Sequence, residues 1–418
     1  MRKTITIAAL VACLGVAFTT VTGGAAQADP TPDYVAAGTI AHPLQSAGRS
    51  TVDAAGRLVI VDPIDLSLIR VGTDGSVEES IPLPLRPDYL IPRPDGSVLA
   101  WATGGDLARV DASGAVSVVD LPGFARWVAV APTGDLQVTD DVSAIWVQQP
   151  DGSFMHQVTV PGLHATTLSY ITPALDDYVC GTALLKLTVR GIIEVDRGRL
   201  ECEGMTHAPD GDLVVAWGNG DFVKYDPAGT ATLIARAPAD RGVTWDFHLL
   251  PTGDIVYRDS RQSFYRIAPD GSVYEARRGG WQSYGSTSGS ELDSNSVAVS
   301  ADGVLYSVNR KGGVDRYTLS DLETAVFDGY VPTPTLLAGS STLYAYPTWS
   351  GPASTRFSVV AGALPTGMTL DPVHGDIAGA PRVAGTSTVT IRLNPGTGAP
   401  SIDRTVTFTV APSRRGTY

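Results

Sequence analysis

The chain has 418 residues, of which 43% are hydrophobic and 17% are charged, and its formal net charge is −13 at pH 7. The hydrophobic fraction excludes a mainly disordered chain, and 45 Gly with 29 Pro is typical of a β-protein rich in turns. The acidic balance, without a basic patch interleaved with aromatic residues, argues against nucleic-acid binding.

The N-terminal 28 residues have the pattern of a secretion signal. Arg2 and Lys3 precede an apolar run from Ile5 to Phe18, and Ala26–Ala28 is an Ala-x-Ala cleavage site. The sequence therefore predicts a signal peptide over residues 1–28 and a secreted mature chain, in which no further stretch is apolar for long enough to span a membrane.

The leader has two other readings. The run that ends at Cys13 resembles a lipobox, so processing to a lipoprotein is a second hypothesis for the localisation. An uncleaved membrane anchor is a third, although the apolar run is short and no stop-transfer pattern follows it.

Two short phrases, each a turn with Gly followed by an alternating strand, recur from residue 51 onwards. The glycines of the first phrase are Gly56, Gly96, Gly134, Gly211, Gly253 and Gly303. Those of the second are Gly75, Gly114, Gly152, Gly191, Gly229 and Gly271, which are 38 to 42 residues apart. Hairpin turns at this period predict propeller blades, each with four antiparallel strands A to D.

The number of blades depends on the fourth unit. Gly191 has no Gly of the first phrase at the usual distance before it, and the expected position is Pro173. If this is a degenerate repeat, the chain has seven blades over residues 34–331. If it is an insertion, the chain has six.

These phrases resemble the NHL-type and SMP-30/streptogramin-lyase-like β-propeller repeats. The resemblance implies a propeller but no particular function, because this fold hosts scaffolds, receptors and enzymes.

Two cysteines remain after the signal peptide. Cys180 lies near the end of strand B in the fourth unit, and Cys202 lies in the connection to the fifth. Both positions belong to the same face of a propeller, and secreted proteins oxidise such pairs. We expect a Cys180–Cys202 disulfide, which should stabilise the degenerate blade by about 2–4 kcal/mol.

The two series of turns share one face of a propeller, so the B–C loops and D–A connections share the other. The longest connection is Arg277–Asn295, and long loops on a rigid scaffold commonly bind ligands, although a Gly/Ser spacer explains this segment equally well. The candidate ligand-binding residues on this face are Trp217, Asn219, Arg258, Asp259, Trp281 and Tyr284.

The chain lacks the common catalytic motifs, so no catalytic residue is assigned. Acidic residues, Asn and His on or near innermost strands are the remaining candidates for a divalent-cation site of the kind that SMP-30-like lactonases use: Glu203, His207, Asp246, His248 and Asn295. These residues match no family motif. A hydrogen-bonded channel histidine is the alternative for His207 and His248.

A different domain follows the repeats. Val331-Pro-Thr-Pro-Thr335 predicts a linker over residues 332–335, and the next segment is rich in Thr and Val. Leu364-Pro-Thr-Gly-Met-Thr-Leu-Asp371, followed by Gly375 and Gly379, resembles the bacterial putative-Ig (cadherin-like) module. The resemblance implies a β-sandwich over residues 336–411, with a tail at 412–418, and allows calcium as the family's cofactor.

The sequence as a whole predicts an all-β, secreted protein with a propeller and a C-terminal Ig-like module. The expected role is non-catalytic binding of an extracellular protein or glycan at the loop-rich propeller face, such as cell adhesion. The alternative is a metal-dependent lactonase, hydrolase or lyase with its site at the channel mouth.

Overall fold

The computed structural model describes residues 49–102, 104–131, 133–160, 168–171, 177–188, 190–197, 200–238, 247–259, 263–277, 280–283, 294–300, 302–309, 314–330, 336–339 and 343–412. All of them belong to the second of two compact units, Met1–Asp33 and Tyr34–Tyr418. The predicted signal peptide and Cys13 lie outside these residues. The described part of the chain contains no helix, and so none that could cross a membrane.

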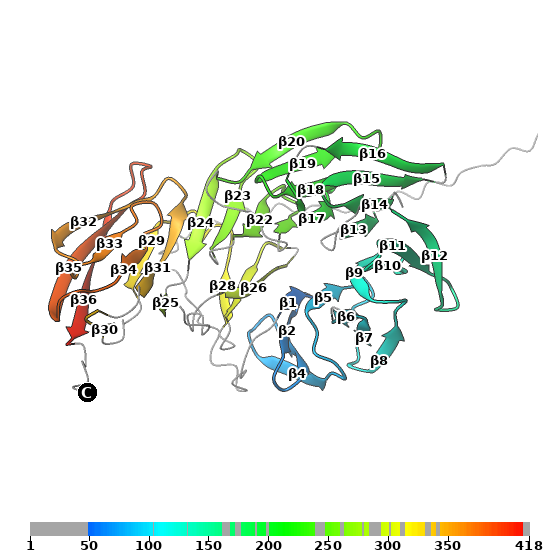
Figure 1. Cartoon of the computed structure of the whole chain (residues 1–418), viewed down its shortest axis with the longest axis horizontal. Coiled ribbons are helices and arrows are strands. Elements are labelled where there is room, and N and C mark those ends of the chain that lie inside the picture. The colour runs from blue at the N-terminus through cyan, green and yellow to red at the C-terminus, as the bar shows by residue number, and fades with distance from the viewer. Residues whose placement is uncertain are drawn as a thin grey trace, which may run out of the picture. The chain divides into compact units, whose positions relative to one another are not determined.

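The first four sheets are antiparallel and follow one another along the chain (Figure 1). Their strands are β1 (Ser50–Val52), β2 (Leu58–Asp62), β3 (Ser67–Val71), β4 (Val77–Pro82); β5 (Tyr89–Pro92), β6 (Val98–Trp101), β7 (Asp106–Val110), β8 (Val116–Asp120); β9 (Ala125–Val130), β10 (Leu136–Asp140), β11 (Ala144–Gln148), β12 (Phe154–Thr159); β13 (Leu168–Ile171), β14 (Asp177–Cys180), β15 (Ala183–Thr188) and β16 (Gly191–Arg197).

Three further sheets continue this series. Their strands are β17 (Cys202–His207), β18 (Leu213–Trp217), β19 (Asp221–Tyr225), β20 (Ala231–Arg236); β21 (Phe247–Leu249), β22 (Ile255–Arg258), β23 (Phe264–Ile267), β24 (Val273–Arg277); β26 (Ser294–Val299), β27 (Leu305–Asn309) and β28 (Val314–Tyr317). We interpret the seven sheets as propeller blades one to seven.

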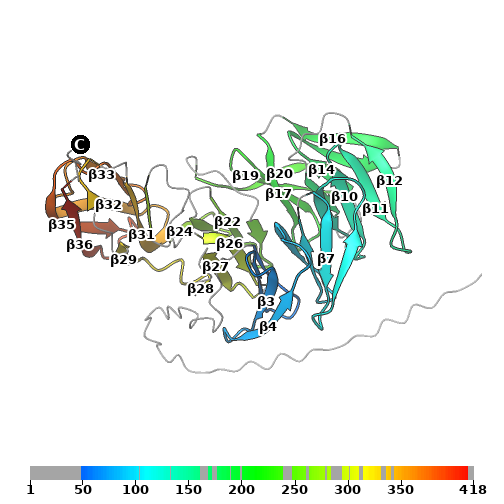
Figure 2. The same cartoon turned by 60° about the horizontal axis from the view of Figure 1, so that its bottom comes forward.

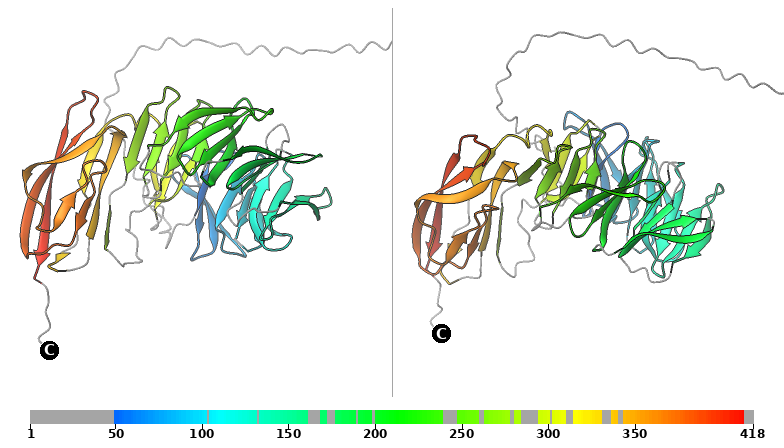
Figure 3. Two further views of the ribbon diagram at one scale, coloured as in Figure 1. Left: turned by 45° about the horizontal axis from the view of Figure 1, so that its top comes forward. Right: turned by 90° about the horizontal axis from the view of Figure 1, so that it is seen from above.

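Apolar packing between neighbouring sheets explains the arrangement. Every residue of β2, β3 and β10 is buried, as expected for middle strands covered on both faces. The last sheet also packs on the first, since Ile60 and Ile69 share a buried cluster with Tyr306 and Val308. Figures 2 and 3 show these two sheets side by side, in yellow and blue. The sheets therefore close into the ring that the repeats predict.

Polar side chains add contacts between consecutive blades. Arg70 on β3 is fully buried, and its guanidinium donates to the carbonyl oxygens of Asp111 (2.6 Å) and Ala112 (3.2 Å) in the next blade. Lys186 on β15 and Arg266 on β23 reach the carbonyls of Pro227 and Leu319 in the same way. The third strands of blades one, four and six thus each carry a basic residue that donates hydrogen bonds to backbone carbonyls of the next blade.

The predicted disulfide is confirmed. Cys180 at the end of β14 is bonded to Cys202 at the start of β17, and their Cα atoms are 5.9 Å apart. The bond joins blades four and five, so it links the degenerate repeat to its neighbour.

The Ig-like module is also confirmed. One sheet has the order β30-β36-β35-β32, and β31 pairs with β25, β29 and β34. The strands are β25 (Gly280–Ser283), β29 (Val326–Tyr330), β30 (Leu336–Leu337), β31 (Leu343–Pro352), β32 (Arg356–Gly362), β33 (Met368–Leu370), β34 (Ile377–Gly379), β35 (Gly385–Asn394) and β36 (Ile402–Ala411). Because β29 pairs with β31, the module's strands begin before the linker that the sequence predicts at 332–335.

The module is joined to the propeller by backbone pairing. Outer strand β24 of blade six pairs with β31, from Tyr274–Pro352 to Arg277–Trp349 (Figure 1). At the end of this seam, Arg277 Nη1 donates to Asp376 Oδ1 at 2.6 Å. The Arg277 side chain is 4% exposed and lies over the ring of Tyr346. Burial raises the pKa of Asp376, and the Arg277 charge opposes that shift.

We predict that Arg277→Met will destabilise the protein by about 3–5 kcal/mol, because Asp376 would be left buried without its cation. Urea unfolding followed by tryptophan fluorescence measures the loss. The matched control is Arg392→Ala, which breaks the exposed Arg392–Asp403 pair of the same module and should leave the midpoint almost unchanged. Equal midpoints for the two variants would contradict the structural role of Arg277.

The pair Gln137–Asp177 predicts a pH dependence. Gln137 Nε2 on β10 donates to Asp177 Oδ2 on β14 at 2.7 Å, and burial raises the pKa of Asp177 to about 6. A raised native pKa stabilises the fold below the unfolded pKa of about 4, and this contribution disappears as the pH rises through 6. The free energy of unfolding of the wild type should therefore fall by about 2–3 kcal/mol between pH 4 and 7, and Asp177→Asn should abolish this fall.

Urea unfolding of both proteins at several pH values provides the test. The exposed turn residue Asp270 supplies the control Asp270→Asn, which should keep the wild-type slope between pH 5 and 7. Identical pH dependence for wild type and Asp177→Asn would show that Asp177 titrates normally.

Candidate functional site

The two faces of the propeller differ chemically. We call the face with the A–B and C–D turns the turn face, and the face with the B–C loops and D–A connections the loop face. The exposed side chains of each face indicate which of the two can bind another molecule.

The turn face carries many aspartates. Seven aspartates of its turns have a lowered pKa, because Ser or Lys side chains, or backbone amides of the same turn, donate hydrogen bonds to their carboxylates: Asp74, Asp95, Asp111, Asp151, Asp210, Asp226 and Asp270. In Asp151, for example, Oδ1 accepts from Ser153 N at 3.0 Å and from Ser153 Oγ. These carboxylates stay ionised and are already used by their own turns.

The loop face offers large apolar side chains. Five are exposed in its loops: Ile64 (55%), Leu66 (38%), Phe124 (44%), Val142 (67%) and Leu200 (63%). The other exposed large apolar residues in the described part of the propeller lie on outer strands β8, β12, β16 and β20, and none lies in an A–B or C–D turn. Apolar contacts with a partner are therefore possible at the loop face and around the rim.

An aromatic cluster underlies the loop face at blades two and three. Tyr89 stacks on Trp101 with ring centroids 4.8 Å apart, and both meet the edge of Trp127. Trp101 is buried, whereas Tyr89 and Trp127 are half-buried. The cluster gives this part of the face a rigid apolar floor.

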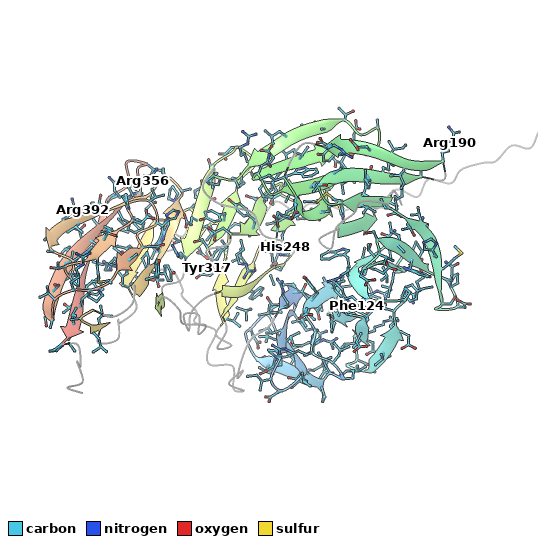
Figure 4. The ribbon with its side chains drawn as sticks, in the orientation of Figure 1. Phe124, Arg190, His248, Tyr317, Arg356 and Arg392 are labelled. Carbon is cyan, nitrogen blue, oxygen red and sulfur yellow. A yellow bond between two sulfur atoms is a disulfide. The ribbon has the colours of Figure 1, made fainter. Side chains whose placement is uncertain are left out.

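Phe124 lies just before β9, in the connection from blade two (Figure 4). A Cβ atom on Gly104 would be 3.2 Å from its ring, so the glycine of the B–C loop leaves room for it. The Arg126 guanidinium lies over the same ring, with Cζ 4.9 Å from the centroid. Phe124 and Arg126 thus present a stacked aromatic and cationic pair at the loop face.

A β-bulge occurs at the same place on three innermost strands. On β9, Trp127 pairs with Thr139 but Ala125 pairs with Asp140, so Arg126 is the extra residue. The corresponding extra residues are Glu203 on β17 and Asn295 on β26. Bulges redirect side chains and are frequent beside functional sites. All three bulges are at the loop-face ends of their strands.

The structure changes the reading of several predicted ligand residues. Trp217 ends β18 fully buried, and its Nε1 donates to Tyr225 Oη at 3.2 Å. Asp259 is 1% exposed, and its carboxylate accepts from Ser263 N and Tyr265 Oη. Trp217 is in the core because β18 extends as far as this residue, whereas Asp259 directly follows β22 and is buried by its contacts within the B–C loop. Neither can contact a ligand at the surface.

The remaining predicted ligand residues have mixed outcomes. Asn219 lies in the B–C loop of blade five, where its side chain bonds to Asp221. Arg258 ends β22 and is partly exposed. The backbone of Trp281 is part of β25, opposite Ala345 of the module, and its side chain lies outside the described residues, as does Tyr284.

The predicted metal ligands lie at two levels. Glu203 and His207 are four residues apart on β17, about 13 Å along a regular strand, so they lie towards opposite ends of it. His207 and His248 are nearer the turn face, and partial burial lowers the pKa of His207. Among the described side chains, no three His, Cys, Asp or Glu residues form a metal-binding group. Asp246 and the side chain of Asn295 are not among them.

The sequence analysis missed Phe124 and Arg126. Their connection, Leu121-Pro-Gly-Phe124, is short, whereas long loops are the usual sequence signal of a binding site. The available signal was a large aromatic residue directly after a Pro-Gly turn, two residues before an arginine.

Comparisons with known proteins agree with the two parts of the fold. Residues 325–411 match the family model described as "Putative Ig domain". A streptogramin B lyase structure has 13% identity and a TM-score of 0.53, and covers 66% of this chain and 94% of its own. Selenomethionine-substituted virginiamycin B lyase from Staphylococcus aureus has 15% identity and a TM-score of 0.52, over 67% and 97%.

A catalytically inactive virginiamycin B lyase from Staphylococcus aureus, solved with quinupristin, has 13% identity and a TM-score of 0.53, over 67% of this chain and 97% of its own. Identities this low show a shared propeller fold and nothing about activity. No curated protein matches the sequence significantly.

Proposed function

We propose that this protein is a secreted, non-catalytic binding protein that holds a protein partner at the loop face of its propeller. The observation that carries the proposal is the contrast between the two faces. The turn face presents carboxylates that its own turns already bind, whereas the loop face presents five exposed apolar side chains and, at blades two and three, an aromatic cluster.

The kind of side chain favours a protein over a glycan. Four of the five exposed residues are aliphatic, namely Ile64, Leu66, Val142 and Leu200. Burying such aliphatic side chains against the apolar side chains of a partner is favourable, and the core of a protein interface is apolar and enriched in aromatic residues. The disulfide and the Ig-like module are compatible with an extracellular location, which the predicted signal peptide also favours.

The test compares two triple variants of the mature protein. Ile64→Ser/Val142→Ser/Leu200→Ser removes loop-face residues that are 55%, 67% and 63% exposed. The matched control, Val118→Ser/Ile193→Ser/Leu233→Ser, removes outer-strand residues that are 58%, 53% and 51% exposed. Both should fold, since exposed substitutions seldom change stability by more than about 0.5 kcal/mol.

Each protein is immobilised and exposed to extracellular and cell-envelope fractions of its source organism, and the bound proteins are quantified. We expect the loop-face variant to retain at most about a tenth of the partner that the wild type binds, because buried apolar contacts dominate binding. The outer-strand variant should bind like the wild type. Undiminished binding by the loop-face variant would contradict the proposal.

A metal-dependent enzyme remains the second candidate, because the bulges place Glu203 and Asn295 at equivalent positions of two blades. Of the residues that the sequence predicts, such a site would use Glu203, Asn295 and Asp246, without His207. A divalent cation at 100 times its Kd would add about 2.7 kcal/mol of stability.

Under the binding proposal, thermal unfolding should be the same with and without a chelator, and with calcium, zinc or manganese added back. A chelator that reversibly lowers the melting temperature of the wild type and of His207→Gln, but not that of Glu203→Gln, would instead support the enzyme. A chelator that lowers the melting temperature of both variants would point to a structural ion elsewhere.

A further inference from the structure

Arg126 is a half-buried arginine at the loop-face end of β9. Its Nε atom is buried and has no hydrogen-bond partner, and none of the described carboxylates forms an ion pair with it. Its guanidinium lies over the Phe124 ring. By contrast, Arg70, Arg266 and Arg277 each pair with a carboxylate. In a chain with a net charge of −13, a half-buried guanidinium without an acidic partner needs an explanation.

The carboxylate on the neighbouring strand is already used. Asp140 Oδ1 accepts from Val142 N (3.0 Å) and Ala144 N (2.8 Å), and Oδ2 accepts from Trp146 Nε1 (3.0 Å). The bulge at Arg126 turns its side chain out of the regular alternation of β9, so the fold itself sets the direction of the guanidinium. Arg126 is therefore available to an external anion.

The surroundings define the rest of the ligand. The Phe124 ring covers one side of the guanidinium and is itself 44% exposed, so a group that reaches Arg126 also meets an aromatic surface. A stacked, partly dehydrated guanidinium binds anions more strongly than a fully hydrated one. One guanidinium matches a single negative charge, and its planar fork matches the two oxygens of a carboxylate.

We infer that Phe124 and Arg126 form a subsite for a carboxylate carried beside an apolar or aromatic group, as in a partner segment where Asp or Glu adjoins a large apolar residue. This inference rests on the proposed function and names the chemistry of the partner at blade three. Arg126 fixes the carboxylate, and Phe124 packs against the apolar group.

The test uses small probes on the mature protein, so that it does not require the partner. The probes are 4-phenylbutyrate, its neutral analogue 4-phenylbutanol, and butyrate, titrated by NMR. The variants are Arg126→Gln, Arg126→Lys and Phe124→Ser. The matched control is Arg190→Gln, an exposed arginine at the tip of the β15–β16 hairpin on the turn face (Figure 4).

We expect 4-phenylbutyrate to bind the wild type about tenfold more tightly than either other probe. Arg126→Gln should weaken 4-phenylbutyrate to the level of 4-phenylbutanol, and Arg126→Lys should recover part of the difference. Phe124→Ser should weaken 4-phenylbutyrate to the level of butyrate, while Arg190→Gln binds like the wild type.

Equal affinities for the acid and the alcohol, no detectable binding of 4-phenylbutyrate, or equal losses in Arg126→Gln and Arg190→Gln would overturn the subsite. The proposed function fails separately, when the loop-face triple variant still captures its partner. If the triple variant loses its partner but Arg126→Gln binds 4-phenylbutyrate like the wild type, the subsite is rejected and the proposed function stands.

Discussion

The fold depends on covering both apolar faces of each antiparallel sheet. Every side chain of middle strands such as β2 and β10 is buried. A single sheet cannot bury its own two faces, so other sheets have to pack against them. Each blade is therefore covered by its neighbours, and the sheet of β26 to β28 packs on the first sheet through Tyr306 and Ile60. Ring closure leaves the loops and turns at the two faces as the segments free to vary.

The same constraint explains the junction with the Ig-like module. An outer strand such as β24 carries unpaired backbone groups, and pairing with β31 satisfies them. The buried Arg277–Asp376 pair lies at the end of that seam. The module therefore covers the outer strand of blade six. The outer strands of other blades, such as β16 and β20, still expose apolar residues such as Ile193 and Leu233.

Periodicity in the sequence was sufficient to predict the all-β propeller, the disulfide and the Ig-like module, because turn glycines and the Leu364–Asp371 motif are local signals. The candidate site was harder to predict. Trp217 and Asp259 were expected at the surface but are buried. The length of β18 depends on packing with neighbouring strands, and the Asp259 carboxylate is bonded to Ser263 and Tyr265. The bulge at Arg126 depends on the register between β9 and β10, which a single strand does not encode. The shared position of Arg126, Glu203 and Asn295 emerges only from strand pairing.

The central claim is that the loop face, and not the turn face or the rim, is the binding surface. A crystallographic fragment screen on the mature protein tests it most directly, because it requires neither a known ligand nor a chosen variant. Small fragments collect where apolar surface and unused polar groups coincide. The structure predicts that bound fragments will gather on the loop face around Phe124, Arg126 and Val142. Fragments confined to the Asp-Gly turns or to strands β16 and β20, with the loop face empty, would contradict the claim.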